Sequence, residues 1–187
     1  MERNTLIEEL KKVTESLIEQ AAAFKQLTTE ELNYRENAES WSILECLEHL
    51  NLYGEYYLVE IEKKMLAAPQ EKESTLFRPG WLGNYFVGII RPKEGGVKKM
   101  KTLANMNPLN SELGPTVIDR FLKQQRRMLQ LLEQAKSINL TSTKTGVSIS
   151  SLIKLRLGDT FRFVIYHNQR HVLQAERMAG KLRERVV

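Results

Sequence analysis

Apolar residues recur at helical spacing in four long stretches of the chain, with polar residues between them. In the first stretch, Leu10, Leu17 and Phe24 are seven residues apart, which places them on one face of a helix. Four amphipathic helices bury their apolar faces most simply by packing together, so we predict an all-α fold, a four-helix bundle. The stretches cover residues 5–27, 43–68, 114–132 and 159–179.

Capping signals mark the ends of two of these helices. Ser42 and Glu45 have the S-x-x-E spacing of a capping box, which predicts that the second helix begins directly after Ser42. Asp159 is expected to cap the start of the fourth helix. Gly180 is expected to end it, because glycine readily adopts the left-handed conformation common at helix C-termini.

A long crossover joins the second and third predicted helices. All five prolines and six of the ten glycines fall between residues 69 and 115. One short helix is expected there, over residues 81–90, and a crossover of this length often forms a lid or a pocket wall. Further along, residues 140–150 are predicted to form a Ser/Thr-rich loop, followed by a short helical lead-in over 150–157.

Charge and composition add little to this picture. The 28 lysine and arginine residues exceed the 23 acidic residues, for a net charge of +5. The hydrophobic content of 42% and charged content of 27% are ordinary for a globular protein. One basic cluster is broken by Glu94 and two glycines and has no interleaved aromatic residues, so we expect a solvated loop and no nucleic-acid partner. The cluster consists of Arg91, Lys93, Lys98, Lys99 and Lys101.

Features of the whole chain favour a cytoplasmic protein. Cys46 is the single cysteine, which excludes an internal disulfide framework and fits a reducing compartment. The first five residues are polar and include an acid, unlike a secretory signal. No apolar run approaches the roughly 20 residues that span a bilayer. We therefore expect one domain over residues 1–187, with no membrane partner.

The three histidines of the chain are its strongest chemical signal. His167 and His171 lie four residues apart in the fourth predicted helix and share one helix face, while His49 lies in the second. Three neutral imidazoles with an open coordination position are typical of a catalytic metal site. If the helices did not converge, these would be ordinary core-edge or surface histidines. A zincin-type protease is excluded, because Asn168 occupies the position of the motif's glutamate.

Two blocks of sequence surround these histidines. The first runs from Trp41-Ser42-Ile43-Leu44-Glu45 to His49-Leu50. The second runs from Leu157-Gly158-Asp159 through His167 and His171 to Gln174-Ala175-Glu176-Arg177. Together they resemble the DinB superfamily of metal-dependent proteins, over about residues 41–178. The resemblance implies a divalent metal ion held by His49 of the second helix and by His167 and His171 of the last.

What the resemblance implies about activity is broader. Characterised relatives include transferases and isomerases that use a low-molecular-weight thiol such as bacillithiol or mycothiol, and relatives often form homodimers. We therefore expect a homodimer that transfers a small thiol to a small-molecule substrate or performs a related hydrolysis. Zinc or nickel is the expected metal, since imidazole suits both. The alternative is a non-catalytic, stress-related binding or scaffold protein whose metal is structural or absent.

Several neighbours of the histidines are candidates for supporting roles. Glu45, one turn before His49, either orients that imidazole or serves only in the capping box. Tyr53 either lines the pocket or packs at the edge of the core. Gln174 follows His171 by three residues and could accept its hydrogen bond. Arg170 is a candidate anion ligand or local ion-pair partner, and Cys46 is a fourth ligand or a buried apolar residue.

Overall fold

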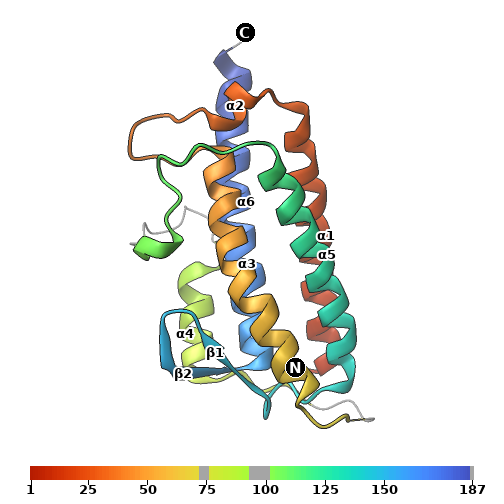
Figure 1. The fold of residues 1–187 in the computed structure, drawn as a ribbon. Helices are drawn as coiled ribbons and strands as arrows, with labels where there is room; N and C mark the ends of the chain where they lie inside the picture. The colour runs from red at the N-terminus through yellow and green to blue at the C-terminus, as the bar shows by residue number, and fades with distance from the viewer. Residues whose placement is uncertain (72–75, 93–101, 186–187) are drawn as a thin grey trace.

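The computed structural model describes residues 1–71, 76–92 and 102–185 of the chain. Figure 1 shows a mostly helical molecule with one small two-stranded sheet. Its elements follow one another as α1 (Arg3–Ala23), η1 (Phe24–Gln26), α2 (Thr29–Asn33), α3 (Ile43–Leu66), α4 (Trp81–Ile90), η2 (Ala104–Met106), α5 (Thr116–Gln134), η3 (Ala135–Ser137), β1 (Lys144–Val147), β2 (Ser150–Arg156) and α6 (Leu157–Arg185), where η marks a 3-10 helix.

The four long helices α1, α3, α5 and α6 lie side by side (Figure 1) and enclose the core. Each of α3 and α1 packs against both α5 and α6. These are the four helices that the apolar stripes predict. The apolar face of each helix is buried against the adjacent helices. Within the described part of the chain, no helix is both long and apolar enough to span a bilayer.

The predicted bounds of the last helix were wrong at both ends. α6 begins at Leu157, two residues before Asp159, and continues past Gly180 to Arg185. Glycine costs only about 1 kcal/mol inside a helix, and Leu182 packs against the core three residues beyond Ala179, so the apolar stripe extends past the glycine. The carboxylate of Asp159 accepts a hydrogen bond from the main-chain N–H of Gly80, directly before α4. Asp159 therefore links two helices.

The start of α3 is the one that the sequence predicts. The Ser42 hydroxyl accepts a hydrogen bond from the Glu45 N–H at 3.2 Å, and the Glu45 carboxylate accepts one from the Ser42 N–H at 2.8 Å. A second capping box, between Thr28 and Glu31, begins the short helix α2, which the apolar pattern does not predict. Five residues are too few for a periodic apolar stripe to be recognised.

Residues 144–156 form an antiparallel hairpin, so the predicted helical lead-in at 150–157 was wrong, and the mostly helical fold includes one small sheet. Apolar residues alternate along the hairpin, and Val147 and Leu155 are both buried, as the period of a strand requires. The hairpin is fixed to α3 by a 2.7 Å hydrogen bond from the Gly146 N–H to the Glu60 carboxylate. A second bond at 3.2 Å joins the Ser148 N–H to the hydroxyl of Tyr57.

The crossover contains the expected short helix α4, which packs against α6 and β2. α4, the hairpin and the η2 segment lie on the same side of the long helices in Figure 1 and cover α3 and α6. Of the basic cluster, Arg91 lies 4.6 Å above the ring of Tyr166 and 3.7 Å from the Glu9 carboxylate. The four lysines of that cluster lie outside the described residues, so its prediction as a solvated loop is not tested.

Candidate metal centre

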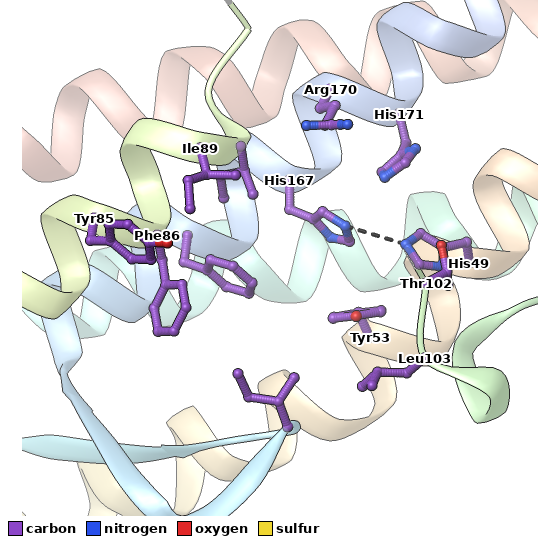
Figure 2. Close-up of a pocket in the computed structure, with 13 residues that line it drawn as sticks. His49, Tyr53, Tyr85, Phe86, Ile89, Thr102, Leu103, His167, Arg170 and His171 are labelled. Carbon is purple, nitrogen blue, oxygen red and sulfur yellow. Dashed lines mark hydrogen bonds between the residues drawn. The ribbon is translucent and has the colours of Figure 1, made fainter. Parts of the chain in front are cut away.

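Three buried histidines meet between α3 and α6. His49 lies near the start of α3, and His167 and His171 lie one turn apart on α6. The Nε2 atoms of His49 and His167 are 3.2 Å apart, and one ligand nitrogen from each of the three rings lies within 4.8 Å of the others. Figure 2 shows the three rings gathered at one end of a cavity. The structure therefore brings the predicted ligand set together.

A main-chain group orients His49. Its Nδ1 lies 2.6 Å from the carbonyl oxygen of Met106, the last residue of η2. Because a carbonyl only accepts hydrogen bonds, Nδ1 must carry the proton, and Nε2 keeps a lone pair. The ring of Trp41 packs nearby, with 4.6 Å between the ring centroids. The tautomer and direction of His49 are thus set for binding a metal through Nε2.

His171 and His167 are oriented differently. His171 Nδ1 lies 3.0 Å from Oε1 of Gln174, so Gln174 occupies the position expected of a ligand-orienting partner. His167 stacks on Phe163, with 6° between the ring planes. The Nδ1 of His167 is buried and has no hydrogen-bond partner among the described residues, while its Nε2 points to His49. Packing, more than hydrogen bonding, fixes this third ring.

Burial keeps all three imidazoles neutral. It lowers the pKa of His49 to about 4 and that of His171 to about 3, and it lowers the pKa of His167 well below its ordinary value. The positive charge of Arg170 contributes to the lowering for each ring. Neutral imidazole is the form that binds metals, so little proton competition is expected near neutral pH.

The observed spacing fits a metal ion. Zinc–nitrogen bonds of about 2.0–2.1 Å in a tetrahedral site place two ligand nitrogens about 3.3 Å apart. The Nε2 atoms of His49 and His167 are 3.2 Å apart. Two lone pairs at this distance repel each other unless a proton or metal ion lies between them. Among the described residues, no further histidine, cysteine or acid joins the cluster, so a fourth position is left open.

The hydrogen bonds of the Glu45 carboxylate go to groups other than His49, and they fix the loop that carries the Met106 carbonyl. The buried Glu45 carboxylate accepts hydrogen bonds at 2.9 and 2.6 Å from Arg35. It also accepts one at 2.8 Å from the main-chain N–H of Asn110, where the chain turns with a φ of 67°. Asn110 lies four residues beyond Met106. Glu45 therefore holds the loop that supplies the carbonyl for His49, in addition to its capping-box role.

The histidines lie at one end of a cavity of about 340 Å³ (Figure 2), here called the aromatic cavity. Tyr53 lines it, with its ring 4.6 Å from that of His167. Burial raises the pKa of Tyr53 to about 12, so its hydroxyl stays protonated and can donate a hydrogen bond. The remaining walls come from α4, the crossover, the hairpin and α6. They are Tyr85, Phe86, Ile89, Ile90, Thr102, Leu103, Ile149, Phe163 and Arg170.

A second hollow of about 470 Å³, here called the polar hollow, lies on the other side of His171. Its walls include Gln174 and the polar turn before α3. Thr102, Arg170 and His171 line both spaces. Of the three histidines, only His171 also lines the polar hollow.

Three further residues, Cys46, Trp81 and Asn168, lie outside the histidine cluster and the aromatic cavity. Cys46 is buried in the core, and burial raises the pKa of its thiol, which fits a buried apolar residue. Trp81 is 82% exposed and does not line the aromatic cavity. Asn168 donates a buried hydrogen bond to Gln125 at 3.0 Å, so it links α6 to α5.

Sequence reasoning missed two contributors to the site. The Met106 carbonyl leaves no sequence signal, because every residue has one. Ile149, at the tip of the hairpin, lines the aromatic cavity. The available signal is the alternation of Ile153 and Leu155 before the last helix, which is too short to identify a strand by itself.

Comparisons with known proteins agree with the site. Searches of curated proteins and of solved structures found no significant match to this chain. A family model, described as the DinB superfamily, matches residues 6–175, which include all three histidines. This match covers most of the chain, and the protein therefore belongs to the DinB superfamily.

Proposed function

We propose that this protein is a divalent-metal-dependent enzyme whose ion is bound by His49, His167 and His171 in a four-helix bundle. The convergence of three buried, neutral imidazoles, with ligand nitrogens within 4.8 Å of one another, carries the proposal. Zinc or nickel suits this donor set. Family membership supports a metal-associated role, because the family model spans all three positions.

The proposed reaction is transfer of a low-molecular-weight thiol to a small electrophilic substrate, or a related hydrolysis. A divalent ion in this site supplies Lewis acidity and makes a thiol or water easier to deprotonate. The protein's own residues would position the reactants. Tyr53 offers a protonated hydroxyl beside His49 and His167, and the apolar walls exclude water from one side. No acidic residue lines the aromatic cavity among the described residues, so a carboxylate base within that cavity is not proposed.

Metal content tests the first part of the proposal. We expect about one divalent ion per wild-type chain by elemental analysis, and loss of that ion in His49→Ala and His171→Ala. Gln174→Leu removes only the acceptor from His171, so it should keep the stoichiometry but weaken affinity by about 10–100-fold. A wild-type chain that binds no metal after incubation with zinc, nickel or manganese would instead favour the scaffold alternative.

Catalysis needs a separate test. The metal-loaded protein is incubated with a small thiol and an electrophile such as monochlorobimane, and, in parallel, with an activated ester. Conjugation above the uncatalysed rate, lost in His171→Ala and in chelator, supports thiol transfer. Ester cleavage with the same dependence supports hydrolysis. Stable metal binding with neither activity contradicts the enzymatic proposal and leaves a binding protein.

A further inference from the structure

Arg170 occupies the junction between the aromatic cavity and the polar hollow. It lies on α6 between His167 and His171, and it lines both spaces. Figure 2 shows its guanidinium at the same edge of the cavity as His171. Its position suggests contact with whatever occupies the site.

Arg170 supplies the charge on the wall of the aromatic cavity. Apart from the neutral histidines, Arg170 is the only ionisable residue with a charge at pH 7 among the described residues that line the aromatic cavity. Its positive charge acts on all three imidazoles, whose pKa values it helps to lower. A divalent ion on the three neutral rings would add two further positive charges. A site of this charge, with apolar walls, favours a negatively charged ligand.

The rest of the aromatic cavity favours an apolar body. Phe86 and Ile89 of α4 and Phe163 of α6 line it, and Ile149 reaches it from the hairpin. The rings of Phe86 and Phe163 are 6.1 Å apart. A volume of about 340 Å³ is at the lower end for small-molecule pockets, which are about 300–1,000 Å³. An aromatic ring or a short aliphatic chain is the matching chemistry.

We propose that the ligand of this site is a small organic anion with an aromatic or aliphatic body, and that Arg170 determines this specificity. The guanidinium binds the carboxylate of the ligand, since its planar fork matches two carboxylate oxygens. The apolar body packs against the wall that Phe86 and Phe163 form together, and the part of the ligand near the carboxylate lies beside the three histidines. The proposal deepens the proposed function by naming a substrate class for the same site.

Binding of a matched pair of probes tests the charge preference. Isothermal titration calorimetry measures the affinity of zinc-loaded protein for 4-phenylbutyrate and for its neutral amide, 4-phenylbutyramide. The carboxylate should bind at least about tenfold more tightly than the amide. Arg170→Gln should abolish most of this preference, and Arg170→Lys should keep part of it. Equal binding of both probes to wild type, or no binding of either, overturns the proposal.

A carboxylate could also bind the metal ion directly, so the same titrations are repeated on metal-free protein. Arg170 recognition predicts that a preference for the carboxylate persists without metal and is lost in Arg170→Gln. If the preference for the carboxylate survives in Arg170→Gln but disappears without metal, the carboxylate binds the metal ion alone, and the role of Arg170 is refuted. If wild type binds no zinc, the metal-site proposal fails, while the metal-free titrations still decide this one.

Phe86→Ala provides the control for the apolar body. Phe86 lines the cavity, away from the histidines in Figure 2, and the variant should weaken both probes by about tenfold without changing their ratio. Its zinc content should equal that of wild type. Unchanged binding of both probes to this variant would show that the body lies elsewhere, which contradicts the proposed binding mode.

Discussion

Glu45→Gln is the change that best tests how the protein orients His49. The Glu45 carboxylate accepts four hydrogen bonds, two from Arg35 and one each from the main-chain N–H groups of Ser42 and Asn110. Glutamine has a similar size but one acceptor oxygen and no charge. The variant should loosen the loop from Met106 to Asn110, which carries the carbonyl bonded to His49.

The magnitude follows from the bonds that are lost. Glutamine can keep about two of the four hydrogen bonds, and each lost bond to a charged group is worth about 1.5–3 kcal/mol. The Arg35 side chain is 27% exposed, so water can replace part of the hydrogen bonding that it loses to Glu45. We expect the free energy of unfolding to fall by about 2–4 kcal/mol, which lowers the melting temperature by roughly 5–15 °C. Zinc affinity should fall by about 10–100-fold, as for loss of a ligand-orienting partner.

Thermal unfolding of metal-free protein and zinc competition with a chelator measure the two effects separately. Ser42→Ala is the matched control, because it removes the cap hydroxyl at a cost of about 1 kcal/mol but leaves Glu45 bonded to Arg35 and Asn110. Its zinc affinity should stay near that of wild type. A Glu45→Gln protein that melts earlier but binds zinc within threefold of wild type would refute the positioning argument.

The packing of α4, the burial of the histidines and the burial of Cys46 can each be tested. In Gly83→Ala, the added Cβ would lie 2.2 Å from Cγ of Asp159, so α4 should shift away from α6. Denaturant titrations should show that the free energy of unfolding falls by about 1–3 kcal/mol. Gly88→Ala is the control, because its added Cβ has nothing within 4 Å and should be neutral or stabilising. Metal-free protein should lose stability as pH falls from 6.5 towards 4. In this range the histidines of the unfolded chain bind protons, whereas folded His49 and His171, with pKa values of about 4 and 3, do not. A denaturation midpoint that stays constant from pH 7 to 5 would contradict this. Burial and a raised thiol pKa should protect Cys46 from Ellman's reagent until the protein unfolds, and Cys46→Ala should keep its metal; labelling of the native protein would show that the thiol is accessible.

The long helices could be predicted because their signals are local. Each apolar stripe repeats over five or more turns, and the Ser42–Glu45 spacing marks the start of α3. The pairing of His167 with His171 is local in the same sense. Their meeting with His49 is not, because a separation of 118 residues carries no distance information; that prediction came from the family resemblance. The hairpin was missed because its strands are too short for their alternation to outweigh a helical reading.

The parts of the site that could not be predicted come from the crossover and the hairpin. The capping-box spacing of Glu45 predicts one of its roles, but its bonds to Arg35 and Asn110 depend on how distant segments fold. The same is true of Met106, whose carbonyl carries no side-chain identity. Sequence motifs thus identify the ligand side chains, whereas the groups that orient them arise from tertiary structure.

The candidate ligands and most of the cavity wall belong to different parts of the fold. The three candidate ligands lie on α3 and α6, two long helices that pack against each other, so their spacing is set by the core. Much of the wall facing them belongs to α4, to Leu103 and to Ile149 at the hairpin tip. Changes in these segments can alter the shape of the aromatic cavity without moving a ligand nitrogen. Substitutions at Phe86 or Ile149 should therefore change the affinity for the apolar body of the ligand at constant zinc content, while substitutions at Glu45 or Gln174 should change zinc affinity first.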